Sequence, residues 1–135
     1  MTTYNHMKPG LFNVGSYQVS GIPWITGSTA LTPGSEDRIV FPRTVRSVTV
    51  INTDASNDDV LVHFNATGSG NVIGGLHFVA LNSNNDSVSF GVKCREIFIS
   101  APLTNSGSTS YTAIGELTNI PSDQMFHLTG SGLTD

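Results

Sequence analysis

Residues 44–52 read Thr44-Val45-Arg46-Ser47-Val48-Thr49-Val50-Ile51-Asn52. The run is dominated by β-branched residues, which favour an extended strand because their side chains are stiff and fit a pleated surface. Turn-forming residues follow at 53–57, and residues 58–65 then place Val60, Val62 and Phe64 at alternate positions. Because only a short turn separates these two runs, we predict that residues 44–52 and 58–65 pair as a β-hairpin.

The same pattern of short alternating runs and polar turns continues on both sides of this hairpin. It predicts strands at 75–81, 87–92, 94–100 and 110–117, a short strand at 38–41 that Pro42 ends, and weaker strands at 17–20 and 24–26. No stretch of 11 or more residues carries helical spacing of apolar residues. We therefore expect an all-β fold, an antiparallel β-sandwich of about eight short strands with jelly-roll-like character.

Alternation also indicates which side chains fill the core and where the domain ends. A chain of 135 residues fits one domain. We expect the sandwich to span residues 16–118, between an N-terminal arm at 1–15 and a C-terminal tail at 119–135. The side chains that we expect to be largely buried are Val50, Val62, Phe78, Phe90, Ile97 and Tyr111.

Both terminal segments lack strand alternation and yet carry large apolar groups. The arm holds Tyr4, Met7, Leu11 and Phe12, and the tail holds Met125, Phe126, Leu128 and Leu133. Disordered tails rarely carry so many apolar groups. Either the segments dock on neighbouring subunits, or they fold back and cover an open end of their own sandwich.

Composition narrows the classes of partner. Charged residues make up 12% of the chain, about half the usual share, and the net charge is −4. The six basic residues form no run, so we expect no direct contact with nucleic acid. There is no run of about 18 apolar residues that would span a membrane, and no secretion signal. With a single cysteine, Cys94, these features favour a protein that folds in a reducing cytoplasm.

No constellation of residues predicts catalysis, a cofactor or a metal. His63 and His77 each precede a phenylalanine in a predicted strand, so alternation places them on a solvent-facing or interface side. The acidic residues at 54, 58 and 59 fit turn chemistry better than a calcium loop. Glu96 is expected beside Lys93 or Arg95. The glycine-rich segment 67–75 lacks the lysine of a phosphate loop and is expected to be a long loop.

The chain resembles small virion structural proteins of tailed bacteriophages, particularly those of marine cyanobacterial phages. The resemblance spans most of the chain. Three segments carry it: residues 9–21 leading into 23–27, residues 92–101, and residues 128–133. They read Pro-Gly-Leu-Phe-Asn-Val-Gly-Ser-Tyr-Gln-Val-Ser-Gly with Pro-Trp-Ile-Thr-Gly, Val-Lys-Cys-Arg-Glu-Ile-Phe-Ile-Ser-Ala, and Leu-Thr-Gly-Ser-Gly-Leu. These are similarities of amino-acid sequence and not chemical motifs, and the family has no catalytic residues to transfer.

The resemblance implies a non-enzymatic virion protein that is assembled in the host cytoplasm. The first expectation is a head decoration or cement protein that binds other virion proteins, above all the major capsid protein, as a homo-oligomer. A tail, neck or fibre component is the second expectation. The residues expected to touch partners are Tyr4, Met7, Leu11, Phe12 and Trp24. The rival hypothesis is a carbohydrate-binding sandwich that stacks Trp24, Tyr17 and Tyr111 on sugar rings.

Overall fold

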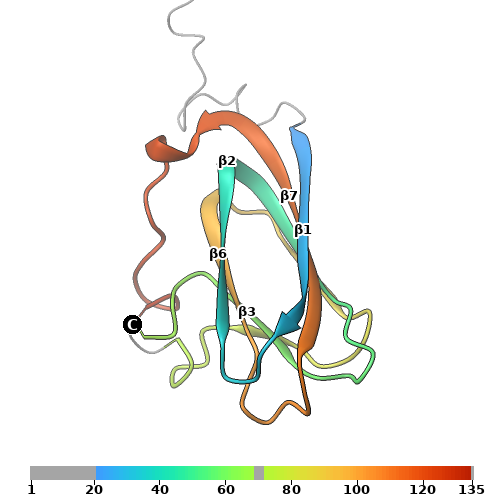
Figure 1. Cartoon of the computed structure of the whole chain (residues 1–135). Coiled ribbons are helices and arrows are strands. Elements are labelled where there is room, and N and C mark those ends of the chain that lie inside the picture. The colour runs from blue at the N-terminus through green and yellow to red at the C-terminus, as the bar shows by residue number, and fades with distance from the viewer. Residues whose placement is uncertain (1–20, 69–71, 135) are drawn as a thin grey trace, which may run out of the picture.

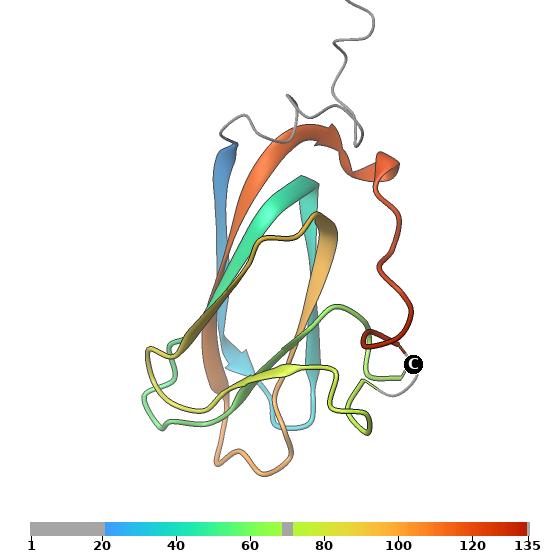
Figure 2. The same cartoon turned by 180° about the vertical axis from the view of Figure 1, so that it is seen from behind.

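Seven strands form the core of the computed structural model, which describes residues 21–68 and 72–134 (Figures 1 and 2). A continuous path of hydrogen-bonded strands runs in the order β1-β7-β2-β6-β3-β4, and β5 also pairs with β2. The only helix among the described residues is the single 3-10 turn η2 (Ser122–Gln124). The strands are β1 (Ile22–Leu31), β2 (Glu36–Asn52), β3 (Val60–His63), β4 (Val79–Leu81), β5 (Ser87–Phe90), β6 (Cys94–Ser100) and β7 (Thr109–Pro121).

The long strand β2 belongs to two sheets. Its first half, residues 36–40, pairs with β6, whereas residues 47–52 lie between β7 and β5. The path therefore folds into one sheet of order β1-β7-β2-β5 (sheet I) and a second of order β2-β6-β3-β4 (sheet II). If the halves of β2 are counted separately, eight segments run 1-8-3-6 in one sheet and 2-7-4-5 in the other. This is the strand order of a jelly roll, and the predicted fold class is confirmed.

The prediction that Pro42 ends a strand was wrong, because β2 continues through it. The pairing of β2 with β6 is irregular between Val40 and Val45, and pairing with β7 begins at Arg43. Pro42 thus lies where β2 leaves one sheet and enters the other, so its missing N–H removes no bond from a regular ladder. Figure 1 shows β2 bending over at this point.

The predicted hairpin between residues 44–52 and 58–65 was also wrong. The strand β3 pairs with β4 and β6 and lies in sheet II, whereas the preceding half of β2 lies in sheet I. The intervening turn is held by Asn52, which is buried and donates from its amide to the carbonyls of Asp58 and Leu81. A polar turn between two runs therefore served here as a crossover between sheets.

The space between the sheets holds the alternate side chains of both. Val50, Val62, Ile97 and Tyr111 are at most 4% exposed, as predicted, whereas Phe78 and Phe90 are only half-buried. Phe90 lies on the short strand β5 at the rim of the sandwich and meets Phe64 edge to face. A position at the rim explains why alternation alone overestimated the burial of Phe90.

The remaining strands differ from the prediction mainly in length. Strand 94–100 is confirmed, and residues 24–26 lie inside β1. Strand 75–81 shrinks to β4, since Leu76 has a φ of 60° that interrupts an extended backbone. β5 ends at Phe90, and β7 continues beyond 117 to Pro121. The predicted strand 17–20, Tyr17, and the arm residues Tyr4, Met7, Leu11 and Phe12 lie outside the described residues.

We predict that Phe41→Ala lowers the free energy of unfolding by about 3–5 kcal/mol, because its ring is 1% exposed and the truncation leaves a cavity. Phe90→Ala should have a smaller effect, because that ring is half-buried. Urea denaturation measures both, and Leu103→Ala serves as the control, since Leu103 is 84% exposed and should change stability by at most about 0.5 kcal/mol. Equal losses for Phe41 and Phe90 would contradict the described packing.

Candidate interaction surface

The outward face of sheet II is covered by the chain itself. Leu61, His63, Glu96, Phe98 and Ser100 point away from the core between the sheets, and yet all are at most 8% exposed. Two segments lie over them: the residues that follow β3, and the C-terminal tail, which descends along β6 in Figures 1 and 2. The part of this face over β3 and β6 is therefore covered by a third layer, whereas Arg38 and Val40 at its β2 edge stay about half exposed.

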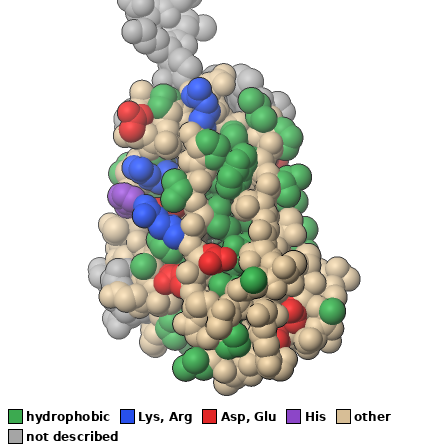
Figure 3. Space-filling view, viewed as in Figure 1, with side chains coloured by type: hydrophobic (Ala, Val, Ile, Leu, Met, Phe, Trp, Pro, Cys, Tyr) green, Lys and Arg blue, Asp and Glu red, His purple; other side chains and the backbone are tan. Residues whose placement is uncertain are grey.

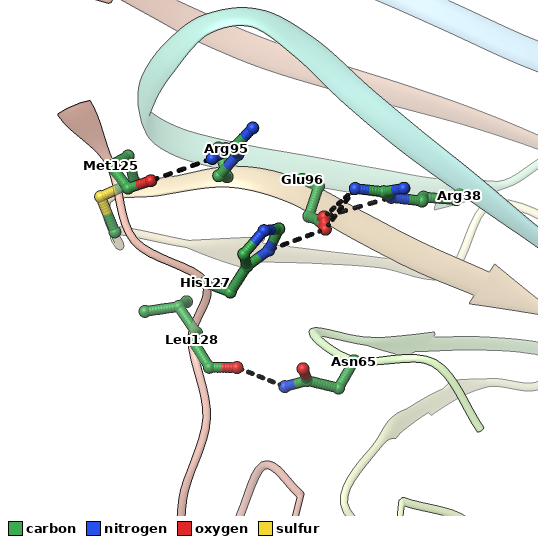
Figure 4. A network of polar contacts seen from close by, with 7 residues as sticks. All are labelled: Arg38, Asn65, Arg95, Glu96, Met125, His127 and Leu128. Carbon is green, nitrogen blue, oxygen red and sulfur yellow. Dashed lines mark hydrogen bonds and ion pairs between the residues drawn. The ribbon is translucent and has the colours of Figure 1, made fainter. Parts of the chain in front are cut away.

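Polar contacts hold the tail in place (Figure 4). The guanidinium of Arg95 donates to the carbonyl oxygen of Met125 at 3.2 Å, and the side-chain amide of Asn65 donates to that of Leu128 at 2.5 Å. Between them, His127 Nδ1 lies 3.2 Å from Glu96 Oε1. These contacts resolve one open alternative, because the C-terminal tail folds back onto its own sandwich.

Glu96 is the charged centre of this layer. Its carboxylate is 8% exposed and accepts bonds from Arg38 at 2.9 to 3.2 Å, from the neighbouring strand β2. The expected partner, Lys93 or Arg95, was wrong, because alternate residues of a strand face opposite sides while cross-strand neighbours face the same side. Removal of Arg38 would leave a buried carboxylate with only His127 beside it, which is costly.

We predict that the docked tail contributes to stability. Leu128 packs against the core cluster and Phe126, two residues earlier, is 65% exposed. Leu128→Ala should therefore lower the free energy of unfolding by about 1–3 kcal/mol, less than a fully buried leucine. The matched control Phe126→Ala should change it by at most about 0.5 kcal/mol. Equal effects in chemical denaturation would mean that the tail is not docked in solution.

His63 was expected on a solvent-facing or interface side, and this was wrong: it is 1% exposed. Its ring stacks on Phe98, with centroids 6.0 Å apart, under the covering layer. Nδ1 lies 2.6 Å from the carbonyl oxygen of Asn65, which only accepts, so Nδ1 carries the proton and Nε2 accepts from the Ser100 hydroxyl at 2.8 Å. Burial lowers the pKa of His63 below 6.5 and keeps the ring neutral, although Asn65 and Glu36 oppose the shift.

The hydrogen bond between Ser100 and His63 has the connectivity of a serine nucleophile and its general base in an acyl-transfer site. Ser100 borders a cavity of about 310 Å³ whose lining includes Glu36, Thr67 and Ala101. Acyl transfer also needs free donors for an oxyanion. The backbone N–H of Ala101 already donates to Ser35, and that of Thr67 donates to Glu36. We therefore assign the pair the structural role of satisfying a buried imidazole.

We predict that stability falls as the pH drops below about 6.5. Above that pH His63 is neutral in both states, but below it the unfolded chain binds a proton that the folded chain resists. The slope for one proton is at most about 1.4 kcal/mol per pH unit. Thermal or urea unfolding between pH 7 and 5.5 measures it. His63→Gln should be less stable at pH 7 and have a shallower slope, and an unchanged slope would contradict the assignment.

The outward face of sheet I is different, because no other described segment of the chain lies over it. Register places Ile25 of β1 beside Ile114 of β7, and Thr49 of β2 on the other side of Ile114. Ile51 and Thr112 form the next row. Ile25 is 65% exposed and the other four are partly exposed. This open face, defined as residues 25, 49, 51, 112 and 114, carries no charge, and the Arg46–Glu116 ion pair borders it.

Sequence reasoning missed the open face, although a signal for it was present. Ile114 occupies the side of its strand opposite to Tyr111, and an apolar residue at an outward position is the mark of a covered or binding surface. Residue 114 alone does not reveal a patch. The patch needs the neighbours that strand order supplies, and one sequence does not give strand order.

Trp24 does not take the place expected of a partner-binding or sugar-stacking residue. It packs against the core cluster and meets Phe41 edge to face, with ring centroids 5.4 Å apart. Tyr111 is 4% exposed, and its hydroxyl donates to Asp37. Figure 3 shows hydrophobic side chains gathered over β1 and along its border with the first half of β2, with basic side chains to one side. On β1 and β2 the exposed large hydrophobic residues are Ile22, Ile25 and Val40.

Other sequence candidates have structural roles. Asp54 is buried and caps the turn that follows β2, accepting from the N–H groups of Ser56 and Asp58. Burial raises the pKa of the Cys94 thiol to about 12, so it is a poor nucleophile. Within residues 21–68 and 72–134, no three His, Cys, Asp or Glu side chains are placed to hold a metal ion. None of the described residues belongs to a helix long and apolar enough to cross a membrane.

Comparison of the chain with protein-family models, with curated proteins and with solved structures finds no match.

Proposed function

We propose that this chain is a non-enzymatic structural protein of a bacteriophage virion, and most specifically a decoration protein that binds the head shell. The observation that carries the proposal is the contrast between the two outward faces of the sandwich. One is largely covered by the chain's own tail and by the residues after β3, whereas the open face presents Ile25, Ile51 and Ile114 without a charge. The resemblance to virion proteins of tailed phages indicates that the assembly to which the chain binds is a virion.

The physical mechanism of such a protein is mass action. A protein that binds only the assembled shell stabilises the shell over its separate subunits, in proportion to its affinity and concentration. The open face suits this role because serine and threonine side chains surround its isoleucines, and these lose little conformational entropy on binding. The partner that fits is another virion protein with a complementary apolar patch, with the major capsid protein first.

A tail, neck or fibre position uses the same face, and no described residue favours it over the head. The carbohydrate-binding alternative is less well supported, because Trp24 and Tyr111, two of its three stacking residues, pack into the sandwich. A direct check is the fluorescence of Trp24, the only tryptophan, during titration with glycans. A saturable change with glycan would favour that alternative.

We predict that Ile114→Lys lowers the affinity of the full chain for phage head shells by roughly 10–100-fold. The shells used for the measurement do not already carry this protein. A buried isoleucine contributes about 1.5–3 kcal/mol, and each 1.4 kcal/mol corresponds to a factor of ten. Co-sedimentation at several protein concentrations measures the affinity, and thermal melting checks that the variant is folded. Phe126→Lys, on the tail, is the matched control and should bind like the unaltered chain. Equal loss in both variants, or in neither, would contradict the proposal.

A further inference from the structure

Among the described residues the sandwich has four edge strands, and three of them are protected against further pairing. An edge strand presents a row of unpaired backbone donors and acceptors, and natural proteins limit it by shortness, charge, proline or a bulge. β4 has 3 residues and β5 has 4. The exposed half of β2 carries Glu36, Asp37 and Arg38 and ends at Pro42.

The fourth edge, β1, is long and uncharged. It has 10 residues, none of them Asp, Glu, Lys, Arg or His, and pairs only with β7 among the described strands. Pro23 near its start and a register shift after Ser28 limit its regular part to residues 24–28. Ile22 is 69% exposed and Ile25 is 65% exposed on this strand. β1 therefore combines free backbone groups with exposed apolar side chains, and it borders the open face.

We propose that β1 pairs antiparallel with β1 of a second copy of this chain, about a two-fold axis near residues 24–28. Such an axis sets residues opposite one another so that their numbers have a constant sum, and a charge near the axis would lie close to its own copy. β1 has none, whereas self-pairing of β2 would bring its own charged residues together. In a chain of net charge −4, this uncharged strand is where two copies meet least repulsion.

The pairing would join two copies of sheet I into one continuous sheet and place the Ile25 side chains of both copies on the same face. A contact of about five residues from each strand is smaller than the roughly 1,200 Å² of a stable interface. We therefore expect a concentration-dependent dimer with a dissociation constant above about 1 μM. The inference does not depend on the proposed function, since its failure would leave binding of the open face to another virion protein intact.

Cysteine cross-linking of the full chain tests the pairing and its register. Single variants Pro23→Cys, Ile25→Cys and Thr29→Cys, all at exposed positions of β1, are oxidised alone and in mixed pairs, while the native Cys94 is buried and serves as the background. A disulfide forms only where two Cα atoms lie about 4.4–6.8 Å apart. The six combinations have six different sums, 46, 48, 50, 52, 54 and 58, so one register permits only one of them. The expected result is that a single combination gives dimer well above the others. Leu103→Cys, exposed on the loop between β6 and β7, is the control for random collision.

Light scattering over a concentration series provides the second readout. The unaltered chain and Leu103→Lys should dimerise alike, and Ile25→Lys should raise the dissociation constant at least roughly tenfold, because two lysines then meet across the axis. Thr29→Lys, also exposed on β1, replaces Ile25→Lys if that variant fails to fold. A chain that stays monomeric up to millimolar concentration, comparable cross-linking of combinations that have different sums, or cross-linking as strong at residue 103 would overturn the proposal.

Discussion

The structure depends on the passage of β2 from one sheet to the other. Residues 36–40 pair in sheet II and residues 47–52 in sheet I, so one strand fixes the spacing and angle of both. The corner is held from inside by Phe41, whose ring lies over Gly115, where a Cβ would come within 3.1 Å of it. It is also held by Thr44, whose carbonyl oxygen accepts from the Thr118 hydroxyl at 2.7 Å. Loss of this corner would separate the two halves of the core.

The corner also decides what each outward face does. Because β2 places Glu36 and Arg38 on the outside of sheet II, that face is polar, and the chain covers it with its own tail and with the residues after β3. The open face of sheet I receives Thr49 and Ile51 from the same strand, and the only ion pair described beside it is Arg46–Glu116. The division of one strand between two sheets thus separates a largely covered face from an uncovered one.

Much of the fold was predictable, because period-two alternation in residues 94–100 and 110–117 depends only on local burial. The sandwich, four of six core positions and most strands follow from that pattern. The predicted hairpin was wrong because the sequence of a turn is the same whether the two strands it joins pair with each other or lie in different sheets, as at residues 53–59. His63 was misplaced because the residues after β3 cover its side of the strand. Glu96 was given the wrong partner because its neighbour Arg38 lies on another strand, which only strand order reveals. The open face needed strand order, which joins Ile25, Ile51 and Ile114.

Hydroxyl-radical footprinting of the full chain, free in solution and within its native assembly, tests the division into a largely covered and an open face most directly. In the free chain the account predicts strong modification of Ile25 and little of Phe98, which are 65% and 8% exposed. On assembly, Ile25 and Ile114 should lose reactivity while Phe98 stays unreactive in both states. Strong modification of Phe98 in the free chain, or an Ile25 that remains as reactive in the assembly, would contradict the account.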